Sequence, residues 1–338
     1  MINTLSKKSL KFGVIGCSCV AKKYFFPATN NSEFTQLGFV GSSSAEKAQT
    51  WAHENDCNFF GSYDEVLESD VDAVYISLPI SMHEEWVIKA AKLGKHILCE
   101  KSSTTSYPSA KNMVKICNDN NVSILECFAF RFHPQHNIVK EYIHNQKLGK
   151  ISHFYGMYGF PSPEPENIRW QKQLGGGILN DVTCYPVCAS RIVFDTEPES
   201  VFADFTMDKN LDVDVSNRIM LNYTKNRYAY AVSGFGNYYQ SSYSIWGSNA
   251  KLSTKRAYAV PQNFETSLFF DQNDTINEIK IPKKDQFLIM LENFTKSVLQ
   301  LENEAFDFKK DLLNQAKTME AIRISHKKKV PIFLNDIS

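Results

Sequence analysis

The sequence predicts an α/β domain built on a doubly wound parallel sheet, followed by an α+β domain with a large, mainly antiparallel open sheet. In the first third of the chain, short continuous apolar runs alternate with amphipathic stretches, which is typical of parallel strands covered by helices on both faces. After about residue 150 the apolar runs follow one another with few helices between them, which indicates antiparallel strands. We therefore expect two domains, over residues 1–126 and 127–338.

The elements of the first domain follow from these runs and the turn residues between them. Strands are expected, in chain order, at Lys11–Gly16, Leu37–Gly41, Ala73–Leu78, His96–Cys99 and Val122–Leu125. Amphipathic segments predict helices at Ala45–Asn55, His83–Leu93 and Tyr107–Asn120. Because parallel strands end at one edge of the sheet, residues just beyond these strands are candidates for binding a ligand.

The second domain is expected to contain consecutive strands. They are placed at Ser152–Phe160, Ser200–Met207, Ile219–Tyr223, Tyr228–Phe235 and Ser241–Trp246. Turn signals such as Lys225-Asn226 and Gly247-Ser248-Asn249 separate them. Two helices, at Lys284–Leu299 and Lys310–His326, are predicted to close the chain.

Composition excludes several classes of function. The hydrophobic fraction of 43%, the charged fraction of 22% and the net charge of +0 argue against a disordered chain and against nucleic acid as a partner. No apolar run approaches the ~18 residues of a membrane span, and Met1–Ser9 lacks the apolar core of a signal peptide. The eight cysteines mostly lie in apolar surroundings, as in reduced proteins, so we expect a cytoplasmic protein without a membrane partner.

A metal site is not expected. Cys184 and Cys188 stand four residues apart on a predicted helix, but no second pair of Cys or His nearby completes a tetrahedral set.

The first strand leads directly into Gly16-Cys17-Ser18-Cys19-Val20-Ala21 and then a helix, which is the context of a dinucleotide-binding loop. Gly16 permits the tight turn, Ala21 permits close helix packing, and free amides at the helix start would face a pyrophosphate. Ser18 stands where a second glycine is usual, and its hydroxyl could donate a hydrogen bond to the phosphate.

The second strand ends in Gly41-Ser42-Ser43-Ser44, where an NAD site usually carries a carboxylate. Small hydroxyls at Ser42 and Ser43 suit the extra phosphate of NADP, and Lys47 could neutralise it. NADP is therefore favoured over NAD. Alternatively, the serines only cap the next helix.

Further segments, together with the glycine loop, complete one pattern. They are Leu78-Pro79-Ile80-Ser81-Met82-His83, Gly94-Lys95-His96-Ile97-Leu98-Cys99-Glu100-Lys101, Phe130-Arg131-Phe132-His133-Pro134-Gln135, and Gly175-Gly176-Gly177-Ile178-Leu179-Asn180-Asp181-Val182-Thr183-Cys184-Tyr185-Pro186. Their order and spacing, over nearly the whole chain, resemble the glucose-fructose oxidoreductase and inositol dehydrogenase family, Gfo/Idh/MocA. Within it the motifs look most like sugar-nucleotide 3-ketoreductases, with sugar and dihydrodiol dehydrogenases close behind.

By this resemblance Lys101 is the lysine of the Glu-Lys-Pro motif, with Ser102 in place of the proline. Asp181 and Tyr185, at i and i+4 of a predicted helix, project from one face and can reach one ligand. A phenol can protonate a carbonyl oxygen while hydride arrives, and a neighbouring ammonium stabilises its phenolate. Each residue also has an ordinary interpretation: an exposed lysine, a half-buried aromatic, and an ion-paired aspartate.

The resemblance implies that Leu78, Pro79, His83 and Glu100 lie at the cofactor, although Ile80 replaces a frequent asparagine. Arg131, His133 and Arg169 are candidates for the substrate, because an arginine fork suits a diphosphate. The arginines could equally form ion pairs between domains.

The resemblance thus implies a Rossmann-type first domain, and an enzyme that moves hydride between nicotinamide and a sugar alcohol or ketone, with a sugar or sugar-nucleotide as substrate. Alternatives are a dihydrodiol or free-sugar dehydrogenase, and a non-catalytic nucleotide-binding regulator. The sheet of the second domain, apolar on both faces in Tyr228–Phe235, predicts a homodimer or homotetramer.

Overall fold

The computed structural model describes residues 9–338, which divide into two compact units. The first unit comprises the described residues up to Thr104, together with Pro108–Ala129 and Phe287–Leu313. The second comprises Thr105–Tyr107, Phe130–Gln286 and Asn314–Ser338.

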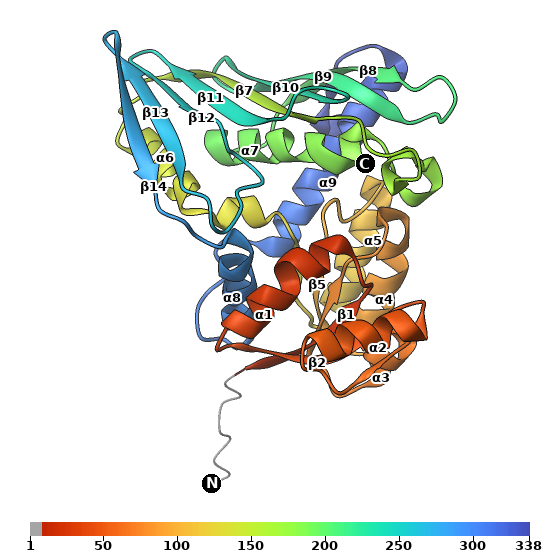
Figure 1. Ribbon diagram of the computed structural model, residues 1–338. Helices are drawn as coiled ribbons and strands as arrows, with labels where there is room; N and C mark the ends of the chain where they lie inside the picture. The colour runs from red at the N-terminus through yellow and green to blue at the C-terminus, as the bar shows by residue number, and fades with distance from the viewer. Residues whose placement is uncertain (1–8) are drawn as a thin grey trace. The chain divides into compact units, whose positions relative to one another are not determined.

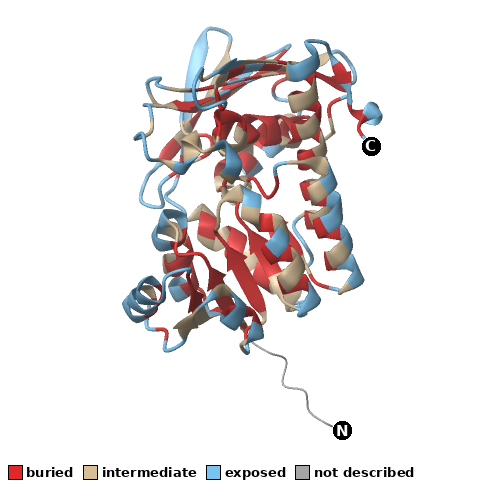
Figure 2. Cartoon of the chain, turned by 90° about the vertical axis from the view of Figure 1, so that its right-hand side faces the viewer, coloured by how far each residue is buried: buried red, intermediate tan, exposed pale blue. Residues whose placement is uncertain are grey.

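The first unit is built on a six-stranded parallel sheet with the strand order β3-β2-β1-β4-β5-β6. Its strands are β1 (Leu10–Ile15), β2 (Thr35–Gly41), β3 (Phe60–Gly61), β4 (Ala73–Ile76), β5 (His96–Cys99) and β6 (Ile124–Glu126). The central strands are buried (Figure 2). The order turns back between β1 and β4, so the doubly wound prediction is confirmed.

Helices cover both faces of this sheet. They are the π-helical turn η1 (Ala21–Phe25), α1 (Phe26–Asn31), α2 (Ala45–Glu54), α3 (Tyr63–Glu68), the 3₁₀ turn η2 (Ile80–Met82), α4 (His83–Lys92), α5 (Tyr107–Asp119) and α8 (Gln286–Val298). On one face, the ring of Phe12 lies 5.7 Å from that of Phe25 and 6.4 Å from that of Phe294. On the other, a Cβ at Gly13 would meet Val66 of α3. Burial on both faces explains the continuous apolar strands.

The helix α8 packs with the first unit, which differs from the expected division after residue 126. Aromatic contacts account for this difference, since the Phe287 ring lies 6.4 Å from Phe25 and 6.0 Å from Tyr75. The sequence gives no sign that residues 287–313 return to the first unit, because this depends on contacts between distant segments.

The second unit contains a nine-stranded sheet with the strand order β14-β13-β12-β11-β7-β10-β9-β8-β15. The strands are β7 (Ile151–Phe160), β8 (Ser200–Met207), β9 (Asp214–Tyr223), β10 (Arg227–Phe235), β11 (Gln240–Gly247), β12 (Lys251–Thr254), β13 (Thr266–Gln272), β14 (Thr275–Ile281) and β15 (Ile332–Phe333). β7 and β10 pair in parallel, and all other neighbours in this sheet pair antiparallel. A mainly antiparallel sheet is therefore confirmed.

The remaining elements of the chain are helical. They are η3 (Ala129–Phe132), α6 (Pro134–His144), η4 (Ile168–Trp170), η5 (Lys172–Leu174), the π-helical turn η6 (Leu179–Thr183), α7 (Cys184–Phe194), α9 (Phe308–Lys328) and η7 (Leu334–Asp336). The helix α7 lies along one face of the nine-stranded sheet (Figure 1). Contact there is close, because a Cβ at Gly156 would lie 2.6 Å from Cβ of Pro186.

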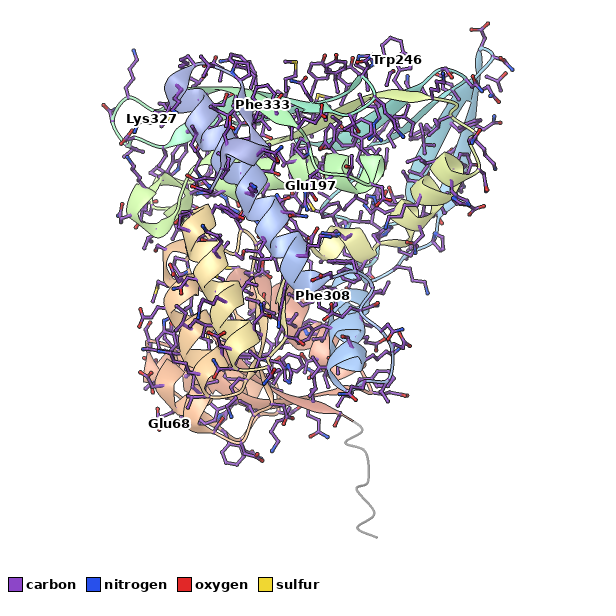
Figure 3. All side chains as sticks on the ribbon, turned by 180° about the vertical axis from the view of Figure 1, so that it is seen from behind. Glu68, Glu197, Trp246, Phe308, Lys327 and Phe333 are labelled. Atoms are coloured by element: carbon purple, nitrogen blue, oxygen red, sulfur yellow. The ribbon has the colours of Figure 1, made fainter. Side chains whose placement is uncertain are left out.

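The other face of this sheet carries exposed apolar side chains. Tyr155 and Met157 of β7, Val232 of β10 and Trp246 of β11 are all exposed, whereas Phe154, which precedes Tyr155 on β7, is fully buried. Trp246 is labelled in Figure 3. Within residues 9–338, no helix is long and apolar enough to cross a membrane.

Candidate active site

The glycine loop at the end of β1 has the geometry of a phosphate-binding turn. Gly16 has a φ of 104°, and a Cβ there would lie 2.8 Å from Leu78 and 3.1 Å from the carbonyl of Ser77, so no larger residue fits. The chain then enters a helix at the exposed residues Cys19 and Val20, whose amides belong to a first turn and lack intrahelical acceptors. This loop fits a pyrophosphate. Ser18 Oγ accepts a hydrogen bond from Ala21 N at 3.1 Å and so braces the loop.

The serines after β2 divide into two roles. Ser42 is buried, and its Oγ accepts from Ser44 N at 3.2 Å, while Ser44 Oγ accepts from Lys47 N and caps α2. Capping, one of the two alternatives, is therefore realised by Ser44. Ser43 and Lys47 are exposed at the start of α2, where a hydroxyl, an ammonium and the helix N-terminus all suit a phosphate. The Lys47 ammonium also lies 5.3 Å from the ring centre of Trp51.

His83 joins two loops at the carboxyl edge of the parallel sheet. Its ring is fully buried, with Nε2 2.8 Å from the carbonyl oxygen of Leu78 and Nδ1 3.3 Å from that of Ser103. Burial lowers the pKa of His83, which favours the neutral ring. The sequence led us to expect this side chain at the cofactor; the structure instead turns it inward, where it supports the loop containing Leu78 and Pro79.

Two buried carboxylates, those of Glu100 and Glu126, accept hydrogen bonds from the backbone of the turn that carries Lys101. Glu100 Oε1 accepts from the Tyr75 hydroxyl at 2.7 Å, and its Oε2 accepts from Lys101 N at 3.2 Å. Glu126 Oε1 accepts from Ser103 N at 2.8 Å. Burial raises the pKa of Glu100. The side chain of Glu100 therefore supports the backbone at Lys101. The peptide bond from Lys101 to Ser102 is cis.

In the second unit, Tyr185 lies at the start of α7 and packs among three aromatic side chains. Its ring centre is 5.6 Å from Phe130, 5.4 Å from Tyr158 and 5.7 Å from Tyr258, and the side chain is only partly buried. An amphipathic phenol in such a position can keep its ring packed and its hydroxyl accessible.

Asp181 and Arg169 form an ion pair beside Tyr185. Arg169 Nε donates to Asp181 Oδ2 at 2.5 Å, and Nη2 donates to Oδ1 at 3.4 Å. Burial alone would lower the pKa of Arg169, but Asp181, Tyr158 and Tyr185 together raise it. The structure thus brings three of the predicted residues, Asp181, Tyr185 and Arg169, into one group. Asp181 lies in a π-helical turn, so the expected regular helix begins only at Cys184.

Of the two remaining candidates, His133 is buried and Arg131 is partly buried. His133 is fully buried, and its Nδ1 accepts from Gln135 N at 3.3 Å, which caps α6. Burial lowers the pKa of His133 to about 4. Arg131 Nη1 lies 3.9 Å from Cys188 Sγ. The Nε2 atom of His133 is buried and has no hydrogen-bond partner among the described residues, and contact of His133 with the substrate stays a prediction.

Sequence reasoning missed the supporting residues. Glu126 could have been found, because it directly follows a predicted strand at the same edge as Glu100. Tyr75 sits within an apolar strand, where its hydroxyl gives no signal. Among residues 9–338, no group of three or more His, Cys, Asp or Glu is arranged to hold a metal ion.

Comparison with known proteins identifies relatives along most of the chain. A model of the oxidoreductase family with an NAD-binding Rossmann fold, GFO_IDH_MocA, matches residues 10–127, and the GFO/IDH/MocA C-terminal domain matches residues 136–253. A dTDP-3,4-didehydro-2,6-dideoxy-alpha-D-glucose 3-reductase of Actinomadura kijaniata is 28% identical, over 96% of this chain and 97% of its own. A D-xylose 1-dehydrogenase (NADP(+)) of Haloferax volcanii is also 28% identical, over 93% of this chain and 96% of its own.

The solved structures agree. The 3-ketoreductase KijD10 from Actinomadura kijaniata, in complex with NADP and TDP-benzene, matches with a TM-score of 0.90 and 28% identity, over 94% of this chain and 98% of its own. Two family models in the expected order and a full-length structural match confirm the resemblance given by the motifs. The chain belongs to the Gfo/Idh/MocA family and is an NAD(P)-dependent oxidoreductase.

Proposed function

We propose that the chain reduces a ketone on a nucleotide-activated deoxysugar with NADPH, as a sugar 3-ketoreductase. The observation that carries this proposal is the group formed by Tyr185, Asp181 and Arg169, in which a partly accessible phenol lies beside a paired guanidinium. Similarity over 96% of the chain to a dTDP-sugar 3-reductase supports the choice of substrate.

In this proposal Tyr185 is the proton donor. The nicotinamide, when bound, supplies the hydride. Reduction of a ketone creates an alkoxide, which needs a proton or a cation as it forms. Tyr185 gives its phenolic proton to that oxygen, and positive charge nearby stabilises the phenolate that remains. Lys101 supplies this charge, and Arg169 adds to it from within the second unit while Asp181 fixes the direction of the guanidinium.

The cofactor-binding assignments form a second part of the proposal. The amides of Cys19 and Val20 bind the pyrophosphate, with Gly16, Ser18 and Ala21 shaping the loop. Ser43 and Lys47 bind the 2'-phosphate that distinguishes NADP from NAD, with Ser42 fixing the strand end. Leu78 and Pro79 border the nicotinamide. His83 supports the loop that contains them, and Glu100 supports the backbone at Lys101.

A free-sugar dehydrogenase is the second candidate, because the Haloferax volcanii D-xylose dehydrogenase matches nearly as much of the chain. It would use the same residues in the oxidative direction. The regulator alternative is the weaker one, because a sensor needs no accessible phenol beside a guanidinium.

The decisive experiment follows NADPH absorbance with the purified protein. One arm supplies a dTDP-3,4-didehydro-2,6-dideoxyglucose generated in the cuvette, and the other supplies D-xylose with NADP⁺. We expect rapid oxidation of NADPH in the first arm and slow or no reduction of NADP⁺ in the second. Faster turnover of xylose would select the dehydrogenase, and tight NADPH binding without turnover of any keto sugar would select the regulator.

Two further points complete the proposal. None of the eight cysteines, all within residues 9–338, forms a disulfide bond, as is usual in a reducing compartment, which supports a cytoplasmic protein. The exposed apolar face of the nine-stranded sheet supports a homodimer or homotetramer.

A further inference from the structure

The segment that places Asp181 and Tyr185 is irregular and is held by contacts from outside it. It begins at Gly177, passes through the π-helical turn η6 and only then becomes the regular helix α7. π-Helical turns are rare and are frequently found at functional sites. The contacts that hold this turn from outside the segment therefore bear on the geometry of the site.

Asp214, at the start of β9, holds the beginning of this turn. Its Oδ2 accepts a hydrogen bond from Leu179 N at 2.7 Å, which satisfies one of the free amides at the helix start. Its Oδ1 would lie 2.1 Å from a Cβ placed on Gly177, whose φ is 106°. The carboxylate thus fills the space that a side chain would occupy, and the third glycine of the motif is required for this reason.

Asn217, on the same strand, holds the end of the turn. Asn217 Nδ2 donates to Thr183 Oγ1 at 2.8 Å, and all these atoms are buried. Side chains of strand β9 therefore form hydrogen bonds with both ends of the five-residue turn η6, and Asp181 lies between these two ends. Arg323 of α9 adds a third contact, donating to Asn180 Oδ1 at 2.7 Å.

Asp214 is costly to bury. Burial raises the pKa of Asp214 to about 6, although the amide of Leu179 and the charge of Arg323 act in the opposite direction. An apolar residue would avoid this cost, but it could not accept the bond from Leu179.

We propose that Asp214 is a positioning residue for the reaction: through Leu179 N and Gly177 it sets the π-helical turn that aims Asp181 and Tyr185. This inference rests on the proposed function, since it assigns Asp214 a role in the geometry of the same site. A misplacement of about 1 Å at such a site costs on the order of 10²-fold in rate.

The test compares Asp214→Ala, which removes the acceptor, with Asp214→Asn, whose amide oxygen can still accept from Leu179 N. Hydrogen–deuterium exchange of the peptide that contains Leu179 reports the anchor without any substrate. We expect faster exchange there in Asp214→Ala and near-normal exchange in Asp214→Asn.

Kinetics then report the consequence for the reaction. We expect kcat to fall by about 10- to 100-fold in Asp214→Ala, with rescue in Asp214→Asn and unchanged NADPH affinity. Val201→Ala, which opens a cavity in β8 away from this turn, is the control for loss of stability alone and should leave kcat near normal. If Asp214→Ala does not fold, Asn217→Ala is measured in the same way at the other end of the turn.

Unchanged exchange at Leu179, or unchanged kcat, in a folded Asp214→Ala variant would overturn the inference. So would a drop in kcat in Val201→Ala as large as that in Asp214→Ala. Failure of the proposed function looks different, because the unmodified protein would then not turn over the keto sugar while the exchange measurement would still report on the anchor.

Discussion

In both units, buried carboxylates hold the backbone of a turn that carries a residue proposed to take part in the chemistry. Glu100 and Glu126 accept backbone amides of the turn that carries Lys101, and Asp214 accepts the amide that begins the turn of Asp181. Hydrogen bonds from amides to a carboxylate are strong and directional. The backbone of the Lys101 turn and that of the Asp181 turn are therefore held by side chains that need no contact with the substrate.

The first prediction concerns Tyr185 and Lys101. Tyr185→Phe removes one hydroxyl and little volume, so NADPH binding should survive while turnover falls by about 10² to 10⁴, the usual contribution of general acid catalysis. Lys101→Ala should cost at least as much. Because the two residues would act as a unit, the double variant should lose far less than the product of the single effects. Full turnover by Tyr185→Phe in a steady-state assay would show that the phenol is structural.

Cofactor choice is tested at Ser43, the exposed serine at the start of α2. Ser43→Asp places a negative charge where the 2'-phosphate is proposed to bind, so NADPH affinity should fall and the preference for NADPH over NADH should reverse. Ser43→Asn is the neutral control of equal size and should keep the preference. Fluorescence titration with both cofactors measures the ratio; NADH binding as tightly as NADPH to the unmodified protein would contradict the assignment.

The pKa of Asp214 predicts how stability depends on pH. A rise from 3.8 to about 6 corresponds to about 3 kcal/mol. Since the folded-state pKa lies above the unfolded one, this group stabilises the fold below the unfolded pKa, and that contribution is lost as pH rises through about 6. Asp214→Asn should therefore gain stability relative to the unmodified protein between about pH 4 and about pH 8, measured by urea unfolding. If the difference in unfolding free energy between Asp214→Asn and the unmodified protein is the same at about pH 4 and about pH 8, the raised pKa of Asp214 is contradicted.

At the scale of elements, strands β1, β4, β5 and β6 of the first unit are predictable because each is almost wholly buried and forms a continuous apolar run. The two-residue strand β3 is only half-buried and gives no such run. The strand at His96–Cys99 agrees with β5 at both ends. Strand β14 was missed, since its side chains are mostly exposed and give no apolar pattern. The sequence predicts a regular helix where the structure has the turn η6, because a turn of five residues is too short for its period to be visible in the sequence.

In the candidate site, too, some features can be predicted from the sequence and others cannot. The positions of Gly16, Lys101 and Tyr185 were inferred from short motifs, which carry local backbone requirements. The burial of His83, Glu100 and His133 was not, because it depends on contacts such as that of His83 with Ser103, twenty residues away. Contacts of this kind leave no periodic signal.

The return of α8 to the first unit makes a prediction about stability. Phe294 is fully buried, with its ring 6.4 Å from Phe12 and 6.2 Å from Phe308. Phe294→Ala should lower the free energy of unfolding by about 3 to 5 kcal/mol, because it leaves a cavity under the parallel sheet. Lys296→Ala, two residues on, should cost much less. An equal cost in urea denaturation would show that α8 does not form part of this core.

At the scale of the whole molecule, the exposed face of the nine-stranded sheet is the feature that one chain alone does not explain. Stacked aromatic rings run across it from Tyr230 to Tyr155 at 5.0 Å and from Tyr155 to His153 at 6.0 Å, with Trp246 5.6 Å from His153. Trp246 is 53% exposed and Val232 45%. Contiguous apolar surface of this kind usually marks an interface.

We predict that this face pairs with its own copy. A two-fold interface uses the same patch on both subunits, so one substitution changes the contact twice. Val232→Glu places two like charges in the apolar centre and should convert the assembly to particles of 38.5 kDa in light scattering at micromolar concentration. Ile276→Glu, on the exposed edge strand β14, is a control of equal charge outside the aromatic face and should leave the assembly intact. Unmodified protein that already scatters as a 38.5 kDa particle would contradict self-association, and the aromatic face would then need another partner.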